Sequence, residues 1–466
     1  MKNKNNLLIL ICLSFISLNS CNLQLIDNTR KEDNITNRTN ITENDINKTS
    51  KTENIANSNL KSTNIDLNEY IISLIHDTKD FIPAWNKESF KGKWNYIDGV
   101  FLNSIVNIYN ITKDDMYKNF VINYVDKYIS DSGDFLRYVL NGETYNIYDD
   151  GYTFGELDTV CESKILFDLY EWTKDSKYLT LIDNTYSFLL RQSRLSDDIC
   201  FSHKESYKNQ VWLDGFYMYV PFYLRYALLK NDYKIFDEVK LQYQFVNDHM
   251  KDDKTGLFYH GYDDTKSIFW ADSKTGCSKS FWSRSLGWFV TSLVDSIEYF
   301  PDGNNKKYLI NLLNNTLNSI YKYEDKNSYM YYQLTDKGNK SFTVDGSYFI
   351  ATKNTKYNST TTISNYLESS SSSMFAYSYL KAARLNYVDS SFIIKGLNTF
   401  GGIYSHSYNS NTNILNDICI TAGLGPENKP KRDGTPAYYL AEPVGSNDAK
   451  GVGPFLMAYT EYLKFK

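Results

Sequence analysis

The stretch LDGFYMYVPFYLRYALLKNDYKIFDEV, from Leu213 to Val239, decides the fold. It opens on an acidic residue and a glycine, continues as an apolar-periodic run, and turns at the polar segment Lys230 to Asp232 into a second periodic run. An acidic start, a helical period and a short polar turn together predict a hairpin of two helices.

Other parts of the chain repeat this order. Asp98-Gly99 and Leu157-Asp158 each begin an apolar-periodic run, and the two runs lead to Thr112-Lys113-Asp114 and Thr173-Lys174-Asp175. Weaker copies span Trp282 to Phe300 and Glu368 to Leu385, and Gly451 to Lys466 reads as a final helix. Helical hairpins that recur in this way stack side by side to bury their apolar faces. We therefore predict an all-α architecture in which five or six hairpins close into an α/α toroid; an open helical solenoid is the alternative.

In such a toroid the first turns of the inner helices lie at one end of the ring. They would bring Asp98, Asp158, Asp214 and Trp288 toward a common funnel. Helix N-termini carry partial positive charge and favour an anionic ligand. The repeat therefore predicts both an architecture and the place of a binding site.

Asp214 is the candidate catalytic residue. It stands between the indole of Trp212 and Gly215, and Met218 follows one helical turn later. Aromatic neighbours keep water from a carboxylate and favour its protonated form, which a general acid needs at neutral pH. Aromatic walls also suit the apolar faces of a sugar ring. The alternative is that Asp214 only caps a helix.

Two histidines stand near this aspartate in the predicted funnel. GLFYHGYDD, from Gly256 to Asp264, places His260 in an aromatic loop, and His203 precedes Asp214 in CFSHKES. Each is a candidate for substrate binding, and a structural histidine is the alternative for both.

FWSRSLGW, from Phe281 to Trp288, sets Arg284 between Trp282 and Trp288. A planar cation between indoles suits a sugar that carries a carboxylate, because the guanidinium binds the carboxylate while ring faces hold the sugar. The alternative is a structural arginine stacked on tryptophan. The serine run of NYLESSSSSMFAY, which begins at Asn365, would let backbones approach closely at another inner-helix start.

Residues 1–21 read as a targeting segment. The apolar run from Leu7 to Leu18 follows Lys2 and Lys4 and is too short to span a bilayer as a permanent helix. Leu18-Asn19-Ser20-Cys21 is similar to a bacterial lipoprotein cleavage box, so we expect lipidation at Cys21; an ordinary secretory signal is the alternative.

Residues 22–67 are rich in Asn, Thr and Lys and contain no aromatic residue, which predicts a disordered tether. Residues 68–466 contain no Gly/Ser-rich or Pro-rich linker, so we expect one catalytic domain there. The chain is expected to be secreted or to lie on the periplasmic or outer surface, with membrane contact only through the lipid.

Composition and motifs exclude several functions. The formal net charge of −5 argues against a nucleic-acid partner. The sequence has no zinc signature, phosphate-binding loop, GxGxxG or GxSxG motif. The cysteines beyond the targeting segment have no metal-ligand spacing, and the sequence does not pair them: Cys161, Cys200, Cys277 and Cys419.

Eight motifs together resemble one group of enzymes. In chain order they are WNYIDGVF, LDTVCESKILFDLY, NQVWLDGFYM, GLFYHGYD, FWSRSLGW, NYLESSSSSMFAY, ITAGLG and NDAKGVGPFLMA. They are similar to those of the unsaturated rhamnogalacturonyl hydrolases, glycoside hydrolase family 105, which are relatives of the unsaturated glucuronyl hydrolases of family 88. The resemblance covers the chain from about Asp80 to its end and implies an (α/α)6 barrel.

The resemblance also implies a reaction. Such enzymes act on a Δ4,5-unsaturated uronic acid that a polysaccharide lyase leaves at the non-reducing end of an oligosaccharide. An aspartate protonates C4 and helps water add at C5, and the resulting hemiketal opens and releases the remaining saccharide. Ordinary two-carboxylate glycosidases react at the anomeric carbon instead. The resemblance implies no metal and no organic cofactor.

By position, the resemblance makes Asp214 the catalytic acid and base and Asp158 a second catalytic aspartate. It places these residues in the substrate pocket: Tyr96, His203, Trp212, Met218, His260, Trp282, Arg284 and Trp288. Cys161 and Ser163 stand where the family has asparagine and glycine, and Asp98 stands where a histidine is common. An extra acid at Asp98 would repel an anionic substrate unless it were screened or protonated.

The leading prediction is an unsaturated rhamnogalacturonyl hydrolase acting on lyase-generated pectin oligosaccharides. An unsaturated glucuronyl hydrolase acting on glycosaminoglycan, ulvan or arabinogalactan fragments is the nearest alternative. A non-catalytic, surface glycan-binding lipoprotein is the alternative from another class, and the pair Asp158 and Asp214 argues against it. The expected partner is an unsaturated oligosaccharide, and we expect a monomer.

Overall fold

The computed structural model describes residues 64–75, 94, 96–135, 137–140, 143–146 and 156–466. The predicted targeting segment, its lipidation site Cys21 and most of the predicted tether lie outside the described residues. Ile65 and Leu67, at the end of the predicted tether, are buried, and the compact unit begins at Asn64. Within the described ranges, every helix is too short or too polar to cross a membrane.

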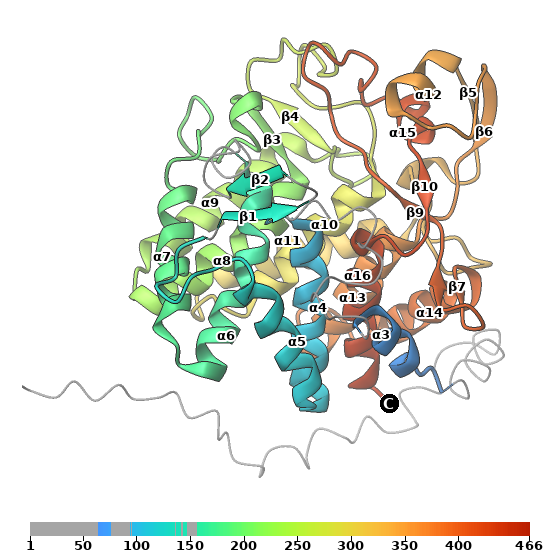
Figure 1. Cartoon of the computed structure of the whole chain (residues 1–466). Coiled ribbons are helices and arrows are strands. Elements are labelled where there is room, and N and C mark those ends of the chain that lie inside the picture. Colours follow the sequence, from blue (N-terminus) through green and yellow to red (C-terminus); the bar gives the residue numbers. More distant parts are fainter. Residues whose placement is uncertain (1–63, 76–93, 95, 136, 141–142, 147–155) are drawn as a thin grey trace, which may run out of the picture. The chain divides into compact units, whose positions relative to one another are not determined.

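A ring of inner helices organises this unit (Figure 1). In chain order they are α4 (Tyr96–Thr112), α6 (Leu166–Thr173), α8 (Leu213–Lys230), α10 (Ser283–Ile297), α13 (Ser369–Arg384) and α16 (Ala449–Leu463). The short turns η3 (Leu157–Val160) and η4 (Glu162–Ile165) precede α6 and make the contacts to α4 and α8. Each inner segment packs on the next, and α16 packs back on α4. The ring is closed, so the predicted (α/α)6 barrel is confirmed and the open solenoid is wrong.

A second layer of helices lies outside the ring. They are α5 (Asp115–Asp126), α7 (Ser176–Leu189), α9 (Lys234–Met250), α11 (Asn304–Tyr321) and α14 (Ser391–His406), each packed on the inner helix before it. Each has one buried and one exposed face, as an outer helix requires.

The outer partner of α16 comes from the other end of the described chain. The helix α3 (Asn68–Ile75) places the ring of Tyr70 6.4 Å from that of Phe455. Just before it, the amide of Leu67 donates a hydrogen bond to the hydroxyl of Tyr459 at 3.4 Å. The two ends of the compact unit therefore complete the barrel together.

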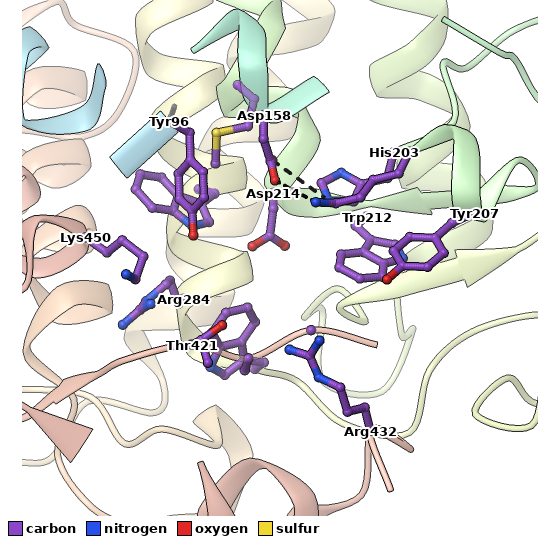
Figure 2. Close-up of a pocket in the computed structure, with 16 residues that line it drawn as sticks. Tyr96, Asp158, His203, Tyr207, Trp212, Asp214, Arg284, Thr421, Arg432 and Lys450 are labelled. Atoms are coloured by element: carbon purple, nitrogen blue, oxygen red, sulfur yellow. Dashed lines mark hydrogen bonds and ion pairs between the residues drawn. The ribbon is translucent and has the colours of Figure 1, made fainter. Parts of the chain in front are cut away.

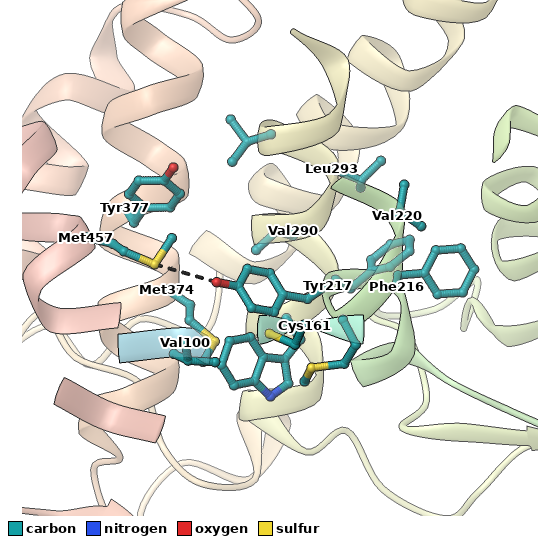
Figure 3. Close-up of a cluster of buried hydrophobic side chains, with 14 of the residues drawn as sticks. Val100, Cys161, Phe216, Tyr217, Val220, Val290, Leu293, Met374, Tyr377 and Met457 are labelled. Carbon is teal, nitrogen blue, oxygen red and sulfur yellow. Dashed lines mark hydrogen bonds between the residues drawn. The ribbon is translucent and has the colours of Figure 1, made fainter. Parts of the chain in front are cut away.

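The helices α8, α10, α13 and α16 are buried over most of their length, and small residues let them approach. All five serines from Ser369 to Ser373 are buried in α13, which agrees with the predicted close packing there. A Cβ at Gly287 would lie 2.5 Å from the sulfur of Met374. Figure 3 shows Tyr217 at the centre of this core, with its hydroxyl 3.9 Å from the sulfur of Met457.

The second inner segment differs from a regular helix start. Asp158 lies in the 3-10 turn η3, and the α-helix begins only at Leu166. The backbone of η4 lies against α4, because a Cβ at Gly99 would be 2.6 Å from the Cα of Glu162. This close contact holds the segment in short turns beside α4.

Short antiparallel strand pairs and two small helices form the loops. The strands are β1 (Arg137–Leu140), β2 (Glu143–Asn146), β3 (Gln210–Trp212), β4 (Gly261–Asp263), β5 (Ser341–Val344), β6 (Thr361–Ser364), β7 (Tyr408–Asn409), β8 (Ile414–Leu415), β9 (Ile418–Cys419) and β10 (Val444–Gly445). The pairs are β1–β2, β3–β4, β5–β6, β7–β8 and β9–β10. The helices α12 (Gly346–Thr352) and α15 (Pro436–Ala441) pack with β5 and the ring of Trp282 in a second small core. The four described cysteines, Cys161, Cys200, Cys277 and Cys419, are unpaired and buried.

Candidate active site

A cavity of about 680 Å³, counting its open mouth, lies where the inner helices begin (Figure 2). Most of the predicted site residues line it: Tyr96, Asp158, His203, Trp212, Asp214, Met218, Trp282, Arg284 and Trp288. They come from four of the inner segments, from the strand β3 and from the loop that carries His203, so the predicted funnel exists.

The first turn of α8 and the pair β3–β4 position Asp214. Trp212 pairs with Gly261, and the amide of Leu213 donates a hydrogen bond to the carbonyl of His260 at 3.1 Å. This pairing places His260 Nε2 3.2 Å from Asp214 Oδ2. The side chain of Asp214 is 13% exposed and that of His260 is fully buried. One oxygen of Asp214 therefore lies beside the imidazole of His260, while the carboxyl faces the cavity.

Contrary to the prediction, His260 does not line the cavity. It lies behind Asp214, and its Nδ1 is 2.7 Å from the hydroxyl of Tyr439. With Tyr439 on one nitrogen and Asp214 beside the other, the ring orientation is fixed. His260 can position the carboxyl of Asp214 but cannot touch a ligand in the cavity.

Directly after Asp214, the packing around residue 215 leaves little room for a side chain. A Cβ there would lie 2.9 Å from Leu157 and 3.2 Å from His203 Nδ1. The absence of a side chain lets η3 and the His203 loop approach the start of α8. This approach brings Asp158 into the same cavity as Asp214.

The surroundings of Asp158 are cationic. Lys204 Nζ lies 3.1 Å from Asp158 Oδ2 and also bonds to Glu156, and His203 Nε2 lies 3.9 Å from Asp158 Oδ1. Burial would raise the pKa of Asp158, but the Lys204 ammonium and His203 together hold that pKa below its usual range. Asp158 is therefore an ionised carboxylate at neutral pH.

His203, which lies beside Asp158, is uncharged at neutral pH. Burial lowers the pKa of His203 to about 4, although the carboxylate of Asp158 acts in the opposite direction. The imidazole can therefore offer a hydrogen-bond donor or acceptor to a ligand at neutral pH, but no charge.

Aromatic rings form the walls of the cavity, largely by stacking on one another. Trp212 stacks on His203 with centroids 4.4 Å apart and on Tyr207 with centroids 5.3 Å apart. Trp288 stacks on Tyr217 at 4.6 Å. These contacts fix the rings before a ligand arrives, so the walls are rigid.

Arg284 lines the cavity but is bound mainly to the protein. Its Nε donates to Ser370 Oγ at 2.8 Å, and its Nη2 donates to the carbonyl of Cys419 and lies 3.4 Å from Glu368 Oε1. Glu368 also caps α13 by accepting a hydrogen bond from the amide of Ser371 at 2.7 Å. Arg284 therefore joins α10, α13 and β9, which gives it a structural role beside the predicted one of binding a carboxylate.

Asp98 does not reach the cavity, contrary to the prediction. It is fully buried in the first turn of α4 and accepts a hydrogen bond of 2.8 Å from the hydroxyl of Tyr124 in α5. The other two departures from the family pattern, Cys161 and Ser163, are also buried, and Ser163 Oγ lies 3.1 Å from Thr185 Oγ1. None of the three lines the cavity, so the expected repulsion of substrate by Asp98 does not arise.

Several lining residues were not predicted: Lys204, Tyr207, Thr421, Ala422, Gly423, Arg432 and Lys450. Lys204 follows His203 directly, and Lys450 lies inside the motif NDAKGVGPFLMA, so the sequence contained a signal for both. Lys450 Nζ pairs with Asp448 at 2.9 Å at the start of α16. Arg432 comes from the loop between β9 and α15, which has no helical period to place it.

Comparisons with known proteins agree with this architecture. The model of Glycosyl Hydrolase Family 88 matches residues 75–352 and 355–466. A family 105 glycoside hydrolase from C. acetobutylicum ATCC 824 is 33% identical and has a TM-score of 0.70, over 85% of this chain and 98% of that one. A family 88 glycosyl hydrolase from Bacteroides vulgatus has the same fold, with 15% identity and a TM-score of 0.56 over 85% of this chain and 98% of that one. Protein Atu3128 of Agrobacterium fabrum is 30% identical over 253 residues, which are 53% of this chain and 98% of that protein.

Proposed function

The chain belongs to Glycosyl Hydrolase Family 88. Within this family, we propose that it is an unsaturated rhamnogalacturonyl hydrolase. It is a glycoside hydrolase of the type that acts on unsaturated uronates. The proposed substrate is a Δ4,5-unsaturated galacturonic acid at the non-reducing end of lyase-generated pectin oligosaccharides. The similarity to a family 105 enzyme over most of both chains favours this substrate over an unsaturated glucuronyl one.

The difference between two carboxyl groups in one cavity carries the proposal. Asp158 is held ionised by Lys204, whereas Asp214 lies against His260 and an indole wall, apart from that cation. Two carboxyl groups in unlike surroundings can divide the roles of proton donor and fixed negative charge. Hydration of an enol ether needs both, because protonation at C4 leaves positive charge at C5 and the ring oxygen.

In the proposed reaction Asp214 donates its proton to C4, and the C4=C5 double bond becomes a single bond. The cation at C5 is stabilised by the ionised Asp158. Water then adds at C5, and the carboxylate of Asp214 takes the proton that the water loses. The hemiketal opens to a ketone at C5, and the hemiacetal left at C1 releases the remaining saccharide as an alcohol. Asp214 ends the cycle protonated, so no other reactant is consumed.

Absorbance of the conjugated uronate gives a direct test. We expect the wild-type chain to remove this ultraviolet absorbance from oligosaccharides of lyase-digested rhamnogalacturonan I. We expect Asp214→Asn to be slower by about 10²- to 10⁴-fold while it keeps the wild-type melting temperature, because it removes the proton donor and conserves volume.

Three other results would change the proposal. Activity on unsaturated glucuronyl fragments alone would change the proposed substrate and leave the proposed mechanism as it is. Equal rates for wild type and Asp214→Asn would show that Asp214 takes no part in the reaction. Binding without turnover of any unsaturated uronide would favour a glycan-binding protein.

A further inference from the structure

The two oxygens of Asp214 have different surroundings. Oδ2 is buried and lies 3.2 Å from His260 Nε2, although the side chain as a whole is 13% exposed. Within the described part of the chain, neither Oδ2 nor Nε2 has another hydrogen-bond partner. One hydrogen shared between these two atoms satisfies both, whereas a buried donor or acceptor left unpaired is costly. This hydrogen belongs either to Asp214 or to His260.

The two cases differ in what Asp214 can do. If Asp214 supplied the hydrogen, its acidic proton would lie on Oδ2 and point at His260 instead of at a substrate. If His260 supplies it, Oδ2 accepts the hydrogen bond and the acidic proton of Asp214 lies on Oδ1. Because Oδ2 is buried, Oδ1 is the oxygen that the cavity can reach. A general acid must carry its proton on the side of the reacting atom.

The hydroxyl of Tyr439 decides between the two cases. It lies 2.7 Å from His260 Nδ1, which is its one hydrogen-bond partner among the described residues. Tyr439 is fully buried, and burial raises the pKa of its hydroxyl well above the usual range, so the hydroxyl keeps its proton. That proton needs an acceptor, and the lone pair of Nδ1 provides one. Nδ1 therefore carries no hydrogen, and the hydrogen of the imidazole lies on Nε2, facing Asp214.

Tyr439 acts from outside the cavity. It lies in α15, where its amide donates a hydrogen bond of 3.2 Å to the carbonyl of Thr435. Its ring stacks on that of Trp282 with centroids 5.8 Å apart, and Trp282 lies 4.7 Å from the ring of His260. Tyr439 does not line the cavity. Its hydroxyl can therefore influence the reaction only through His260.

We propose that Tyr439 is a positioning residue, whose hydroxyl holds the hydrogen of His260 on Nε2 so that Asp214 presents its acidic proton on Oδ1. When that proton passes to C4, Oδ2 keeps the hydrogen bond from Nε2, which stabilises the carboxylate that forms. The water that adds at C5 then returns a proton to Oδ1 and restores the starting state. This inference rests on the proposed function and assigns the proton transfer to one oxygen of Asp214.

Nitrogen NMR of isotope-labelled histidine tests the tautomer without any substrate. The signals of His260 are those that are missing from the spectrum of His260→Gln. We expect wild type to carry hydrogen on Nε2 and none on Nδ1, and Tyr439→Phe to show a mixture, because Nδ1 has then lost its donor. Hydrogen on Nδ1 in wild type would overturn the inference, whatever the activity of the enzyme.

Steady-state kinetics test what the tautomer does. Tyr439→Phe removes the hydroxyl and keeps the ring, so we expect kcat to fall about 5- to 50-fold and KM to change by less than about 2-fold. Tyr379→Phe is the matched control, because its hydroxyl is also buried, lies 2.7 Å from the hydroxyl of Tyr331 and does not line the cavity. It should change neither kcat nor KM by more than about 2-fold. An unchanged kcat in Tyr439→Phe would overturn the inference.

A double variant separates an effect on the tautomer from an effect on packing. In His260→Gln the amide nitrogen carries hydrogen toward Asp214, and the side chain has no tautomer to set. Adding Tyr439→Phe to His260→Gln should therefore lower kcat by less than about 2-fold. Equal losses from Tyr439→Phe in both backgrounds would overturn the inference, because they would show a structural role. Failure of wild type to hydrate any unsaturated uronide would count against the proposed function, while the NMR spectra would still decide the tautomer.

Discussion

Asp158 and Asp214 have the same side chain, but their different neighbours suit them to different roles. Both stand at the start of an inner segment, and both line one cavity. Asp158 has a lysine at 3.1 Å, and Asp214 has a buried histidine at 3.2 Å. The sequence indicated both residues through the repeat, but the lysine that separates their roles is part of a loop contact that no repeat predicts.

The buried carboxyl of Glu442 should make stability depend on pH. Burial raises its pKa from the ordinary 4.5 to about 7, so the folded chain binds a proton that the unfolded chain releases. The stability from this group is complete below pH 4.5 and is lost as pH rises to about 7. Relative to wild type, Glu442→Gln should therefore gain about 1 to 3 kcal/mol in free energy of unfolding between pH 5 and pH 8. Urea unfolding at both pH values measures this gain.

Glu427→Gln is the control for that measurement, because Glu427 is exposed. The free energy of unfolding of Glu427→Gln should differ from that of wild type by the same amount at pH 5 and at pH 8. If Glu442→Gln differs from wild type by the same amount at pH 5 and at pH 8, the carboxyl is already ionised in the fold at pH 5 and the predicted proton is absent.

Arg284 should matter for stability as well as for binding. Arg284→Met would leave the carboxylate of Glu368 buried without its cation, so we expect a loss of about 3 to 5 kcal/mol in urea unfolding. The double variant Arg284→Met/Glu368→Gln should lose less than the sum of the two single variants, because the buried charge is gone. Arg191→Met, at an exposed position, is the control and should change stability by about 0.5 kcal/mol or less. Additive losses would show that the two side chains do not act as a pair.

Among the elements, the inner helices were the most predictable from sequence. An acidic residue followed by an apolar run marked α4 and α8, and the serine run and the stretch from Gly451 to Lys466 marked α13 and α16. These signals exist because helix starts and buried faces leave periodic patterns. The pattern could not predict that Asp98 faces α5, since that depends on how α4 is rotated in the ring. Arg432 was missed for another reason: its loop is placed by contacts with α15 and the ring of Trp212, and these leave no period.

The contact between α16 and α4 allows a test of ring closure. A Cβ at Gly453 would lie 2.6 Å from Val100 Cγ1 and 2.9 Å from the carbonyl oxygen of Val100. Because one of the two close neighbours is a backbone atom, Gly453→Ala must push the two helices apart. We expect it to lower the free energy of unfolding in urea by about 1 to 3 kcal/mol. Gly303→Ala is the control, since nothing lies within 4 Å of the added carbon. Equal stability of the two variants would show that the closing contact is loose.

For the whole molecule, closure of the ring is what assembles the cavity. Lining residues come from α4, η3, α8, α10 and α16, which span nearly the entire described sequence. The last inner helix supplies Lys450 and is covered by α3 from the other end of the unit. The recurring hairpins predicted stacked helices but left an open solenoid as the alternative, and the family resemblance implied the closed barrel.

We propose that this enzyme hydrates a double bond before it releases a sugar. The most direct measurement compares two oligosaccharides that differ only in the terminal uronic acid, which is Δ4,5-unsaturated in one and saturated in the other. Ultraviolet absorbance and release of the remaining saccharide are followed together for wild type and Asp214→Asn. We predict that wild type acts only on the unsaturated compound, that absorbance falls no later than saccharide appears, and that Asp214→Asn does neither at a comparable rate. Release of saccharide from the saturated compound at a similar rate would contradict the account.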